Sequence, residues 1–416
     1  MGFLRRRVVT AALTANAIRP VPGFRAGIPA FFAGWLTGEL APHVLGATVA
    51  DTAWQLSRGR RDARALALAG LTTAGLVHLI SQSRDAVRVA EEALTEGLGV
   101  DYVEQLDAAP SPADLATPWS RLVNPFAFTR AARKAGVEVH RDIAFTAYGG
   151  RGMLDIYTSE ITPASGAPVL LQVHGGGWTI GKKEEQALPL MQHLAAKGWV
   201  CVAINYRLAP RDRWPAQIVD VKAAIAWVRA HIAEYGGDPE YLAITGGSAG
   251  GHLASLAALT PGDPAFQPGF EDADTHVEAA VPYYGVYDMA GASGLPNARL
   301  MRAGFLAKRI FAPGASDADF EAASPLLRVT PDAPDFFVVH GSRDTLVNVG
   351  QARAFVAALR ATSKATVAYA ELPGAQHAFD IFPSIRSAHL VRATDRFLHW
   401  HWNRWRAEKA GRTPMR

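Results

Sequence analysis

The stretch "AITGGSAGGHLASL", residues 243–256, places one serine among glycines between two different kinds of segment. The residues before Ser248 form an apolar, β-branched run typical of a buried strand, and those after it are typical of a helix. Gly246-Gly247-Ser248-Ala249-Gly250 matches G-x-S-x-G, a sharp strand-to-helix turn that lifts the serine hydroxyl above a sheet and tolerates only small neighbours. Because glycine and serine are common, the pattern needs support from a base, an acid and oxyanion donors elsewhere in the chain.

Short apolar runs alternate with helical stretches from about residue 141 onward. A first pair of strands is expected at residues 142–147 and 153–159. Most of the later runs are continuously apolar, as in strands that are buried on both faces. These runs are residues 168–176, 199–208, 241–247, 277–285, 335–341 and 366–374. Helical segments such as residues 215–236 lie between them, so the sequence predicts an α/β fold with a mostly parallel sheet flanked by helices.

The first 90 residues have a different composition, with apolar stretches at 27–38, 41–50 and 65–83. The last of these has no formal charge over 19 residues, which is near the length of a membrane-spanning helix. Arginines gather before it and acidic residues after it, which favours a single span with the N-terminus in the cytoplasm and the α/β part outside. Three alternatives stay open: an apolar cap on the α/β part, helices lying in the membrane interface, and a signal peptide ending near residues 13–17.

Overall composition narrows the function classes only a little. The 416 residues are enough for one large or two ordinary domains, and 49% of them are apolar, as in a packed globular core. A net charge of +4, from 42 basic and 38 acidic residues, is too small to indicate a nucleic-acid partner. The single cysteine, Cys201, lies in an apolar run, so we expect a buried thiol and no intramolecular disulfide.

A second glycine-rich motif, "HGGGW" at residues 174–178, ends an earlier predicted strand. Consecutive glycines let backbone N–H groups converge on one point, where they can stabilise the oxyanion of a tetrahedral acyl intermediate. The motif lies about 70 residues before the serine elbow, which strengthens the interpretation of both. His174 is expected to hold this loop by hydrogen bonds and not to take part in the chemistry.

An acid and a base should follow the serine in the order Ser, Asp or Glu, His. Asp344 and His377 follow the last two predicted strands, at the same edge of the sheet as Ser248. His340 is a rival base but has no carboxylate as well placed, and Asp380 is a rival acid that comes after the base. The remaining histidines considered are expected to have packing or surface roles, and these are His193, His252 and His399.

Together these motifs resemble the hormone-sensitive-lipase-like branch of the α/β-hydrolase fold, the bacterial family IV carboxylesterases, over about residues 140–400. The matching motifs, in family order, are "HGGGW" (174–178), "NYRLAP" (205–210), "WPAQIVD" (214–220), "GGSAGG" (246–251), "YYGVYD" (283–288), "HGSRDTLV" (340–347) and "HAF" (377–379). The apolar N-terminus is similar to that of mycobacterial-type Lip esterases.

The resemblance implies a role for each residue at a matching position. Ser248 would be the nucleophile, His377 the base and Asp344 the acid that orients it. The oxyanion hole would be formed by backbone N–H groups of three residues, Gly176, Gly177 and Ala249. The chain departs from many members of the family at Thr345, where they have proline, and at Ala378, where they have glycine. Neither change removes a catalytic atom, so the departures weaken only what the resemblance implies about subgroup and substrate.

The predicted organisation has three parts: an apolar helical extension (1–86), a helical cap or linker (87–140) and a catalytic domain (141–410) with a cap insertion near 287–330. The expected reaction is hydrolysis of esters with short-to-medium acyl chains through an acyl-serine, with no cofactor and no metal. Membrane or envelope lipids become substrates if the N-terminus reaches a bilayer. An amidase, peptidase or acyltransferase with the same triad, or a non-catalytic ligand-binding member of the fold, are the alternatives.

Several apolar side chains are expected either to line an acyl pocket or to form the core of the cap. They are Trp119, Phe126, Phe128, Met289, Leu295, Met301, Phe305 and Phe311. The tryptophans near the C-terminus, in residues 399–412, are expected to pack on the domain from a terminal helix.

Overall fold

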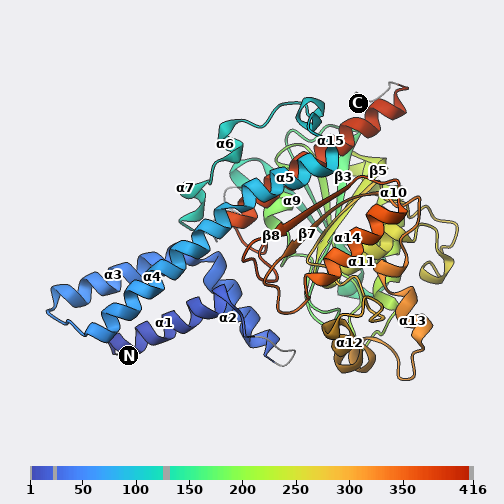
Figure 1. Ribbon diagram of the computed structural model, residues 1–416. Helices are drawn as coiled ribbons and strands as arrows, with labels where there is room; N and C mark the ends of the chain where they lie inside the picture. Colours follow the sequence, from blue (N-terminus) through green and yellow to red (C-terminus); the bar gives the residue numbers. More distant parts are fainter. Residues whose placement is uncertain (1, 22–25, 125–131, 412–416) are drawn as a thin grey trace.

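A computed structural model describes residues 2–21, 26–124 and 132–411 of the chain. Its centre is a single eight-stranded sheet with the strand order β1-β2-β4-β3-β5-β6-β7-β8 (Figure 1). β1 pairs with β2 and β2 with β4 in antiparallel fashion, and all other neighbours are parallel. The bounds are β1 Val137–Ala144, β2 Met153–Ser159, β3 Ala167–Val173, β4 Val200–Ile204, β5 Gly237–Gly247, β6 Ala279–Tyr283, β7 Asp335–Gly341 and β8 Val367–Leu372.

The predicted α/β fold and mostly parallel sheet are confirmed, but the first strand was placed wrongly. It was expected at residues 142–147 and is observed at 137–144. β1 is an edge strand whose only partner is β2, so several of its side chains, including Glu138, are polar and exposed. A strand of this kind lacks the continuous apolar run that identifies the buried strands. The apolar residues at its end therefore misled the prediction.

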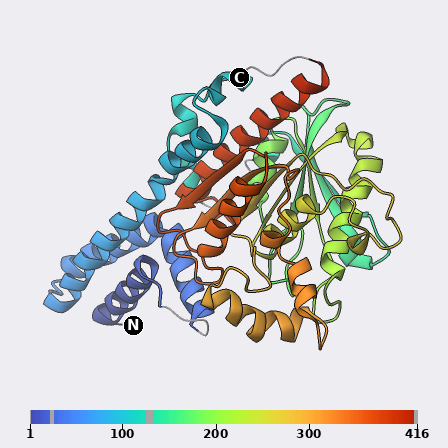
Figure 2. The same cartoon turned by 45° about the vertical axis from the view of Figure 1, so that its right-hand side comes forward.

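Helices cover both faces of the sheet (Figure 2). Alternate residues of a strand point to opposite faces, so Val169 and Leu171 of β3 pack on one layer and Leu170 on the other. The first layer contains α10 Ala216–His231, α11 Ala249–Leu259 and α14 Gly350–Thr362. The second contains α5 Ala86–Leu98, α9 Leu188–Ala195 and α15 Ile385–Lys409. Cys201 is a free, buried thiol in this second layer, as expected, and burial raises its pKa.

The helix α5 lies in the region expected to be a cap or linker, yet it packs against β8 and α15. The backbones approach closely, because a Cβ added at Gly97 would lie 2.8 Å from the Cα of Ala368. α5 therefore belongs to the layer that covers the sheet. The prediction for the C-terminal helix is confirmed, since Trp400 and Trp402 are buried against this same layer.

The N-terminal helices form a projection beside the sheet domain (Figure 1). We define the arm as α1 Phe3–Ile18, α3 Ala41–Ser57 and α4 Ala63–Arg84. α4 packs against both α1 and α3, whereas α2, Gly27–Glu39, lies between the arm and the sheet domain. Among the described residues, Ala63–Leu98 is the one helical stretch long and apolar enough to cross a bilayer, which by itself is weak evidence for a span.

The segment expected to be a cap insertion begins after β6 and contains α12 Pro296–Met301, the π-helical stretch η5 Arg302–Ile310 and α13 Asp317–Ala322. Phe311 packs on Phe320 with ring centroids 4.1 Å apart and also contacts Trp214. The remaining short elements are η1 Tyr102–Gln105, α6 Pro112–Leu115, α7 Trp119–Leu122, η2 Gly149–Gly152, η3 Ile232–Tyr235, η4 Pro264–Phe266 and η6 Pro325–Leu327.

Candidate active site

Ser248 occupies the predicted turn between β5, which ends at Gly247, and α11, which begins at Ala249. Its backbone has φ 59° and ψ −120°, a conformation that is costly for a residue with a side chain and is held here by neighbouring structure. The Ser248 N–H donates to the carbonyl of Tyr283 at 2.9 Å. A Cβ added at Gly250 would lie only 2.0 Å from the carbonyl oxygen of Val173, which explains the small residues around the serine.

Asp344 and His377 form a buried pair at the ends of β7 and β8. His377 Nδ1 lies 2.6 Å from Asp344 Oδ2, and the other oxygen of Asp344 accepts hydrogen bonds from the N–H groups of Leu346 and Val347 at 2.8 Å each. Burial alone would raise the pKa of Asp344, but the two neighbouring histidines, His377 and His340, hold it well below its usual value. Asp344 is therefore an ionised carboxylate that can orient an imidazole.

Tyr284 links the serine elbow to the histidine. Its ring centroid lies 4.6 Å from that of His377, and a Cβ added at Gly247 would lie 2.6 Å from its hydroxyl oxygen. The structure thus brings the elbow, the histidine and the aspartate together at the carboxyl edge of β5, β7 and β8, as expected for an open α/β sheet.

The rival base His340 needs a correction. We expected it to have no carboxylate as well placed, but its Nε2 lies 3.3 Å from Oδ2 of the same Asp344. His340 is completely buried in β7, and its Nε2 also lies 3.0 Å from the carbonyl of Val347. It thus packs behind the aspartate and helps to hold the acid loop. The i, i+4 spacing across the strand end was the signal that sequence reasoning missed.

The rival acid Asp380 does not contact the histidine through a hydrogen bond. Instead, the hydroxyl of Tyr284 donates to its Oδ1. Burial raises the pKa of Asp380 to about 6. The predicted order of acid before base therefore agrees with the geometry, in which Asp344 is the carboxylate paired with His377.

Sequence reasoning also missed Gln376, which connects the acid and base loops. Its Oε1 accepts from the N–H groups of Thr345 at 2.8 Å and His377 at 2.9 Å. Thr345 stands where many relatives have proline, so this N–H contact depends on the departure noted in the sequence. The position of Gln376 next to His377 is a signal in the sequence, but the direction of its side chain is set only by the folded loops.

The glycine loop lies beside the serine, as its motif predicts. A Cβ added at Gly175 would lie 3.2 Å from the Cβ of Ser248, and the N–H of Gly175 donates to Gln186 Oε1 at 2.6 Å. Gly176 and Gly177 have φ values of 112° and 58°, where a side chain would strain the backbone. Ala249 is the first residue of α11, so its N–H belongs to the unpaired donors of a helix start.

His174 supports this loop and has no position in the triad. Its Nδ1 lies 2.7 Å from the carbonyl oxygen of Gly175, and its ring stacks on Tyr206 with centroids 4.2 Å apart. Burial lowers the pKa of His174 to about 4, so it is neutral at ordinary pH. The three histidines that were expected to have packing or surface roles make polar contacts away from the triad: His193 and His399 with Asp395, and His252 with Trp178.

Among the described apolar residues that were expected to line an acyl pocket, Phe305 reaches the glycine loop. A Cβ added at Gly177 would lie 3.6 Å from its ring. Met289 and Phe311 are buried in the core of the first helix layer, and Trp119 is 48% exposed. Phe126 and Phe128 lie outside the described residues.

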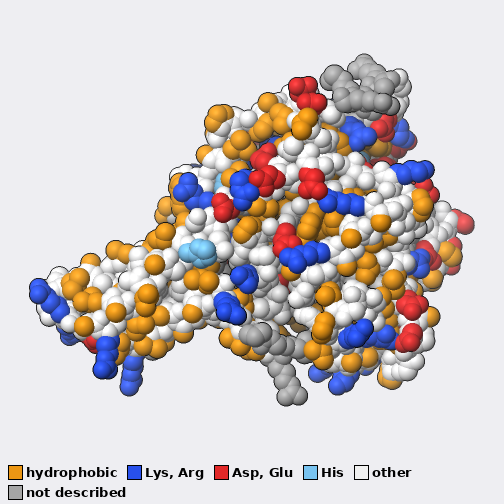
Figure 3. Space-filling model, viewed as in Figure 1, with side chains coloured by type: hydrophobic (Ala, Val, Ile, Leu, Met, Phe, Trp, Pro, Cys, Tyr) orange, Lys and Arg blue, Asp and Glu red, His pale blue; other side chains and the backbone are white. Residues whose placement is uncertain are grey.

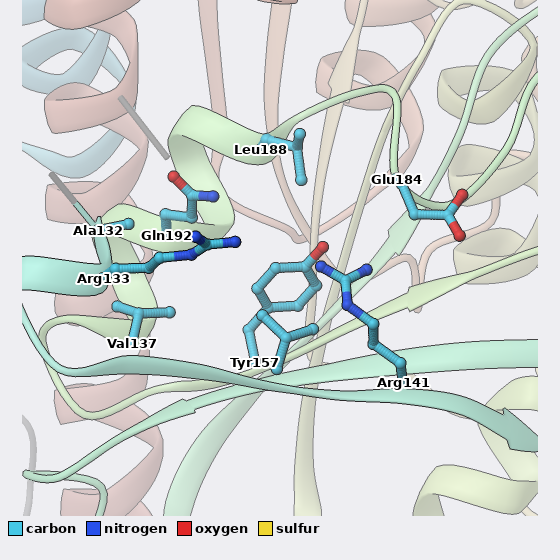
Figure 4. Close-up of a pocket in the computed structure, with 9 residues that line it drawn as sticks. Ala132, Arg133, Val137, Arg141, Tyr157, Glu184, Leu188 and Gln192 are labelled. Carbon is cyan, nitrogen blue, oxygen red and sulfur yellow. The ribbon is translucent and has the colours of Figure 1, made fainter. Parts of the chain in front are cut away.

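A separate cavity of about 270 Å³ lies between the β1–β2 edge and α9 (Figure 4). It contains charged side chains, including Arg133, Arg141 and Glu184, and none of its nine lining residues belongs to the triad or the glycine loop. The described part of the chain contains no group of three His, Cys, Asp or Glu side chains that could hold a metal ion.

Comparisons with known proteins identify relatives that are esterases. The family model BD-FAE matches residues 154–359. Three proteins of Mycobacterium tuberculosis are similar to the chain. The probable carboxylic ester hydrolase LipM is 44% identical over 96% of this chain and 93% of its own length. The esterase LipQ is 43% identical over 88% of this chain and 83% of its own length, and the esterase LipC is 40% identical over 77% of this chain and 79% of its own length.

Solved structures of esterases have the same fold. A truncated carbohydrate esterase from gut microbiota aligns with a TM-score of 0.53 and 25% identity, covering 63% of this chain and 97% of that one. Esterase 2 of Thermogutta terrifontis, phosphonylated by sarin, aligns with a TM-score of 0.53 and 26% identity over 63% of this chain and 94% of that one.

Proposed function

The chain belongs to the family of carboxylic ester hydrolases that includes LipM, LipQ and LipC, and we propose that Ser248, Asp344 and His377 carry out its ester hydrolysis. The observation that carries the assignment is the 2.6 Å contact between His377 Nδ1 and Asp344 Oδ2 beside the strained serine elbow. A serine hydroxyl is a weak nucleophile unless an adjacent base removes its proton, and this pair supplies such a base.

The geometry supports a two-stage reaction. His377 takes the proton of Ser248 through Nε2 as the serine oxygen attacks the ester carbonyl, and Asp344 stabilises the imidazolium that forms. His377 then protonates the leaving alcohol as the tetrahedral intermediate collapses to an acyl-serine. A water molecule, deprotonated by His377, hydrolyses the acyl-serine and returns the enzyme to its starting state.

The developing oxyanion is held by the backbone N–H groups of Gly176, Gly177 and Ala249. Each such donor typically contributes about 3 kcal/mol to transition-state stabilisation. The two glycines adopt left-handed conformations next to Ser248, and Ala249 adds a donor from the start of α11. Phe305 lies beside Gly177 and forms an apolar wall for a short-to-medium acyl chain.

Residues 1–86 attach the enzyme to a membrane, with the catalytic domain outside the cytoplasm. Of the twenty large hydrophobic side chains that are exposed among the described residues, twelve lie in this first fifth of the chain. Such a concentration of exposed apolar surface is typical of a membrane or protein contact. The catalytic domain thus remains in water while its N-terminal helices contact lipid.

The test compares wild type with Ser248→Ala on p-nitrophenyl esters of increasing acyl length. We expect hydrolysis with a preferred short-to-medium chain in wild type, and at least a 10³-fold loss of kcat in the variant. Circular dichroism should show the same fold in both proteins. Substantial activity in Ser248→Ala would mean that another nucleophile carries the reaction.

A further inference from the structure

The helix α2 contacts the catalytic loops although it lies more than 300 residues away from them in the chain. Phe31, which is 8% exposed, meets His377 in an edge-to-face arrangement with ring centroids 5.8 Å apart and planes at 82°. At the start of α2, the carbonyl of Gly27 accepts a hydrogen bond of 3.0 Å from Thr345 Oγ1, the residue next to Asp344. One helix therefore contacts both the base and the acid loop.

Two further contacts fix α2 in this position. Trp35 packs on Phe382, with ring centroids 5.5 Å apart, in the segment that follows His377. At the end of the helix, Glu39 is buried and pairs with Arg386 and the hydroxyl of Ser384. A buried ion pair with an added hydrogen bond strongly disfavours separation, because either partner would be left as an uncompensated charge.

The opposite face of α2 is apolar and exposed. Ile28, Phe32 and Leu36 recur at intervals of four residues, so they share one side of the helix. Their exposed fractions are 61%, 53% and 44%. α2 thus presents one face to the catalytic histidine and an uncovered apolar face on the other side.

The adjoining arm has the side-chain distribution of a helix bundle in lipid. Its interior combines small or polar side chains, including Thr14, Thr48 and Thr72, with the buried leucines Leu76 and Leu79, and a Cβ added at Gly75 would lie 2.7 Å from Thr14. Eight other large apolar side chains point outward: Val8, Val9, Leu13, Val49, Trp54, Leu56, Leu71 and Val77. A water-soluble bundle has the reverse arrangement, whereas helices packed in membranes have small residues at their contacts.

Apart from Arg84, which ends α4 near the sheet domain, the exposed arginines of the arm gather at its far end (Figure 3). Five exposed arginines lie there: Arg5, Arg58, Arg60, Arg61 and Arg64. α4 then has no formal charge from residue 65 to residue 83. At 1.5 Å per residue, its 22 residues extend about 33 Å, close to the thickness of a bilayer core. Trp54 beside Arg58, and Trp35 with Phe32 in α2, place aromatic rings near both ends, as at the two interfaces of a membrane protein.

We propose that α2 is the membrane-facing wall of the active site. The arm enters an anionic bilayer, Ile28, Phe32 and Leu36 contact its surface, and Phe31 on the inner face positions His377. The site then opens at the lipid surface and takes acyl esters that reside in the membrane. This inference rests on the proposed triad, because it assigns to Phe31 the role of a positioning residue for the catalytic base.

Two adjacent phenylalanines provide a matched test in the full-length protein. Phe31→Ala should lower kcat on a soluble short-chain p-nitrophenyl ester by about tenfold to a hundredfold with a smaller change in KM, because a displaced base slows the chemical step. Phe31→Leu refills the space and should recover most of this loss. Phe32→Ser should retain far more of the soluble-ester kcat than Phe31→Ala does.

Sedimentation with phosphatidylcholine vesicles, with and without phosphatidylglycerol, measures how strongly the exposed face of α2 and the arm bind lipid. Wild type should bind better when phosphatidylglycerol is present, because each arginine near an anionic surface contributes about 1 kcal/mol. Phe32→Ser combined with Ile28→Ser should weaken vesicle binding at least fivefold. Val100→Ser, which removes an exposed side chain outside α2 and the arm, should not weaken it.

Two results would overturn the proposal: a wild-type kcat for Phe31→Ala, or unchanged vesicle binding for the α2 double variant. Fluorophosphonate labelling of each variant separates this outcome from a failure of the triad. A wild-type protein that is not labelled at Ser248 would refute the proposed function itself, whatever the result for α2.

Discussion

Two carboxylates, Asp344 and Asp380, lie near His377, and each is a candidate for the acid of the proposed triad. Asp344 bonds to the imidazole, whereas Asp380 bonds to Tyr284. Asp344→Asn should lower kcat by about 10⁴-fold, because an amide cannot stabilise the imidazolium or hold the required tautomer. Asp380→Asn should lower kcat by less than about tenfold.

Steady-state hydrolysis of one soluble ester by the two variants checks this assignment. Both substitutions are nearly isosteric and neither side chain is exposed, so each serves as the control for the other. A larger loss of kcat in Asp380→Asn than in Asp344→Asn would mean that Asp380 is the acid paired with the catalytic base.

Asp380 also predicts a pH dependence of stability. Its pKa rises from 3.8 to about 6 on folding, so the folded state holds the proton more tightly than the unfolded state. The resulting stabilisation is complete below pH 3.8 and is lost as the pH rises through 6. Relative to Asp380→Asn, which does not titrate, wild type should lose about 2 kcal/mol of unfolding free energy between pH 4 and pH 7.

Urea unfolding of both proteins at several pH values measures this difference. The curves of unfolding free energy against pH should diverge between pH 4 and 7, with the variant gaining relative to wild type. Parallel curves would show that Asp380 keeps its ordinary pKa in the folded protein.

At the scale of elements, the serine elbow depends on how closely α11 approaches β3. Gly250→Ala would place a Cβ 2.0 Å from a backbone carbonyl of β3, which cannot move without breaking the sheet. We expect a loss of about 3 kcal/mol or more in unfolding free energy, together with a large loss of activity. Gly46→Ala in α3, where the added Cβ has open space, should change stability by less than about 1 kcal/mol.

Thermal or urea unfolding of the two glycine variants tests the elbow. The comparison separates close packing from the general effect of replacing a glycine by alanine. Equal stabilities would mean that the elbow has room that the structure does not show.

The elements that the sequence predicted best are those with a strong local signal. The buried strands from β3 to β8 have continuous apolar runs, and the elbow has its glycines, so the predicted ranges overlap the observed ones. β1 was displaced because an edge strand exposes polar side chains. The contacts of α2 with the catalytic loops were not predicted, because an apolar helix near a terminus has the same local pattern whether it packs on lipid or on protein.

The candidate site was predictable to a similar extent. Chain order and strand ends were enough to select Ser248, Asp344 and His377. Of the neighbours that hold them, Tyr284 lies in the motif at residues 283–288 but had no role assigned from sequence, and Phe31 comes from a distant segment without a motif. Their roles follow from packing that forms only when the sheet brings those segments together.

In the whole molecule, the sheet domain is joined to a projecting helical arm (Figure 1), and many large apolar side chains of that arm are exposed. Hydrophobic side chains are visible along its surface in Figure 3. α2 lies between the sheet domain and the arm, and its Phe31 contacts His377, the proposed base. The fold therefore places an ester-hydrolysing site next to the surface proposed to meet lipid. Under the proposed function, this arrangement connects substrate class to architecture, since an ester dissolved in a membrane would be delivered beside His377.

Mass spectrometry of the trapped intermediate identifies the residue that is acylated during turnover. Full-length protein is mixed with a p-nitrophenyl ester, quenched in acid within the first turnover and digested for mass spectrometry. We expect one added acyl mass on the peptide that contains Ser248, and none in Ser248→Ala. An acyl group on a different residue, or turnover with no acylated peptide at any quench time, would contradict this expectation.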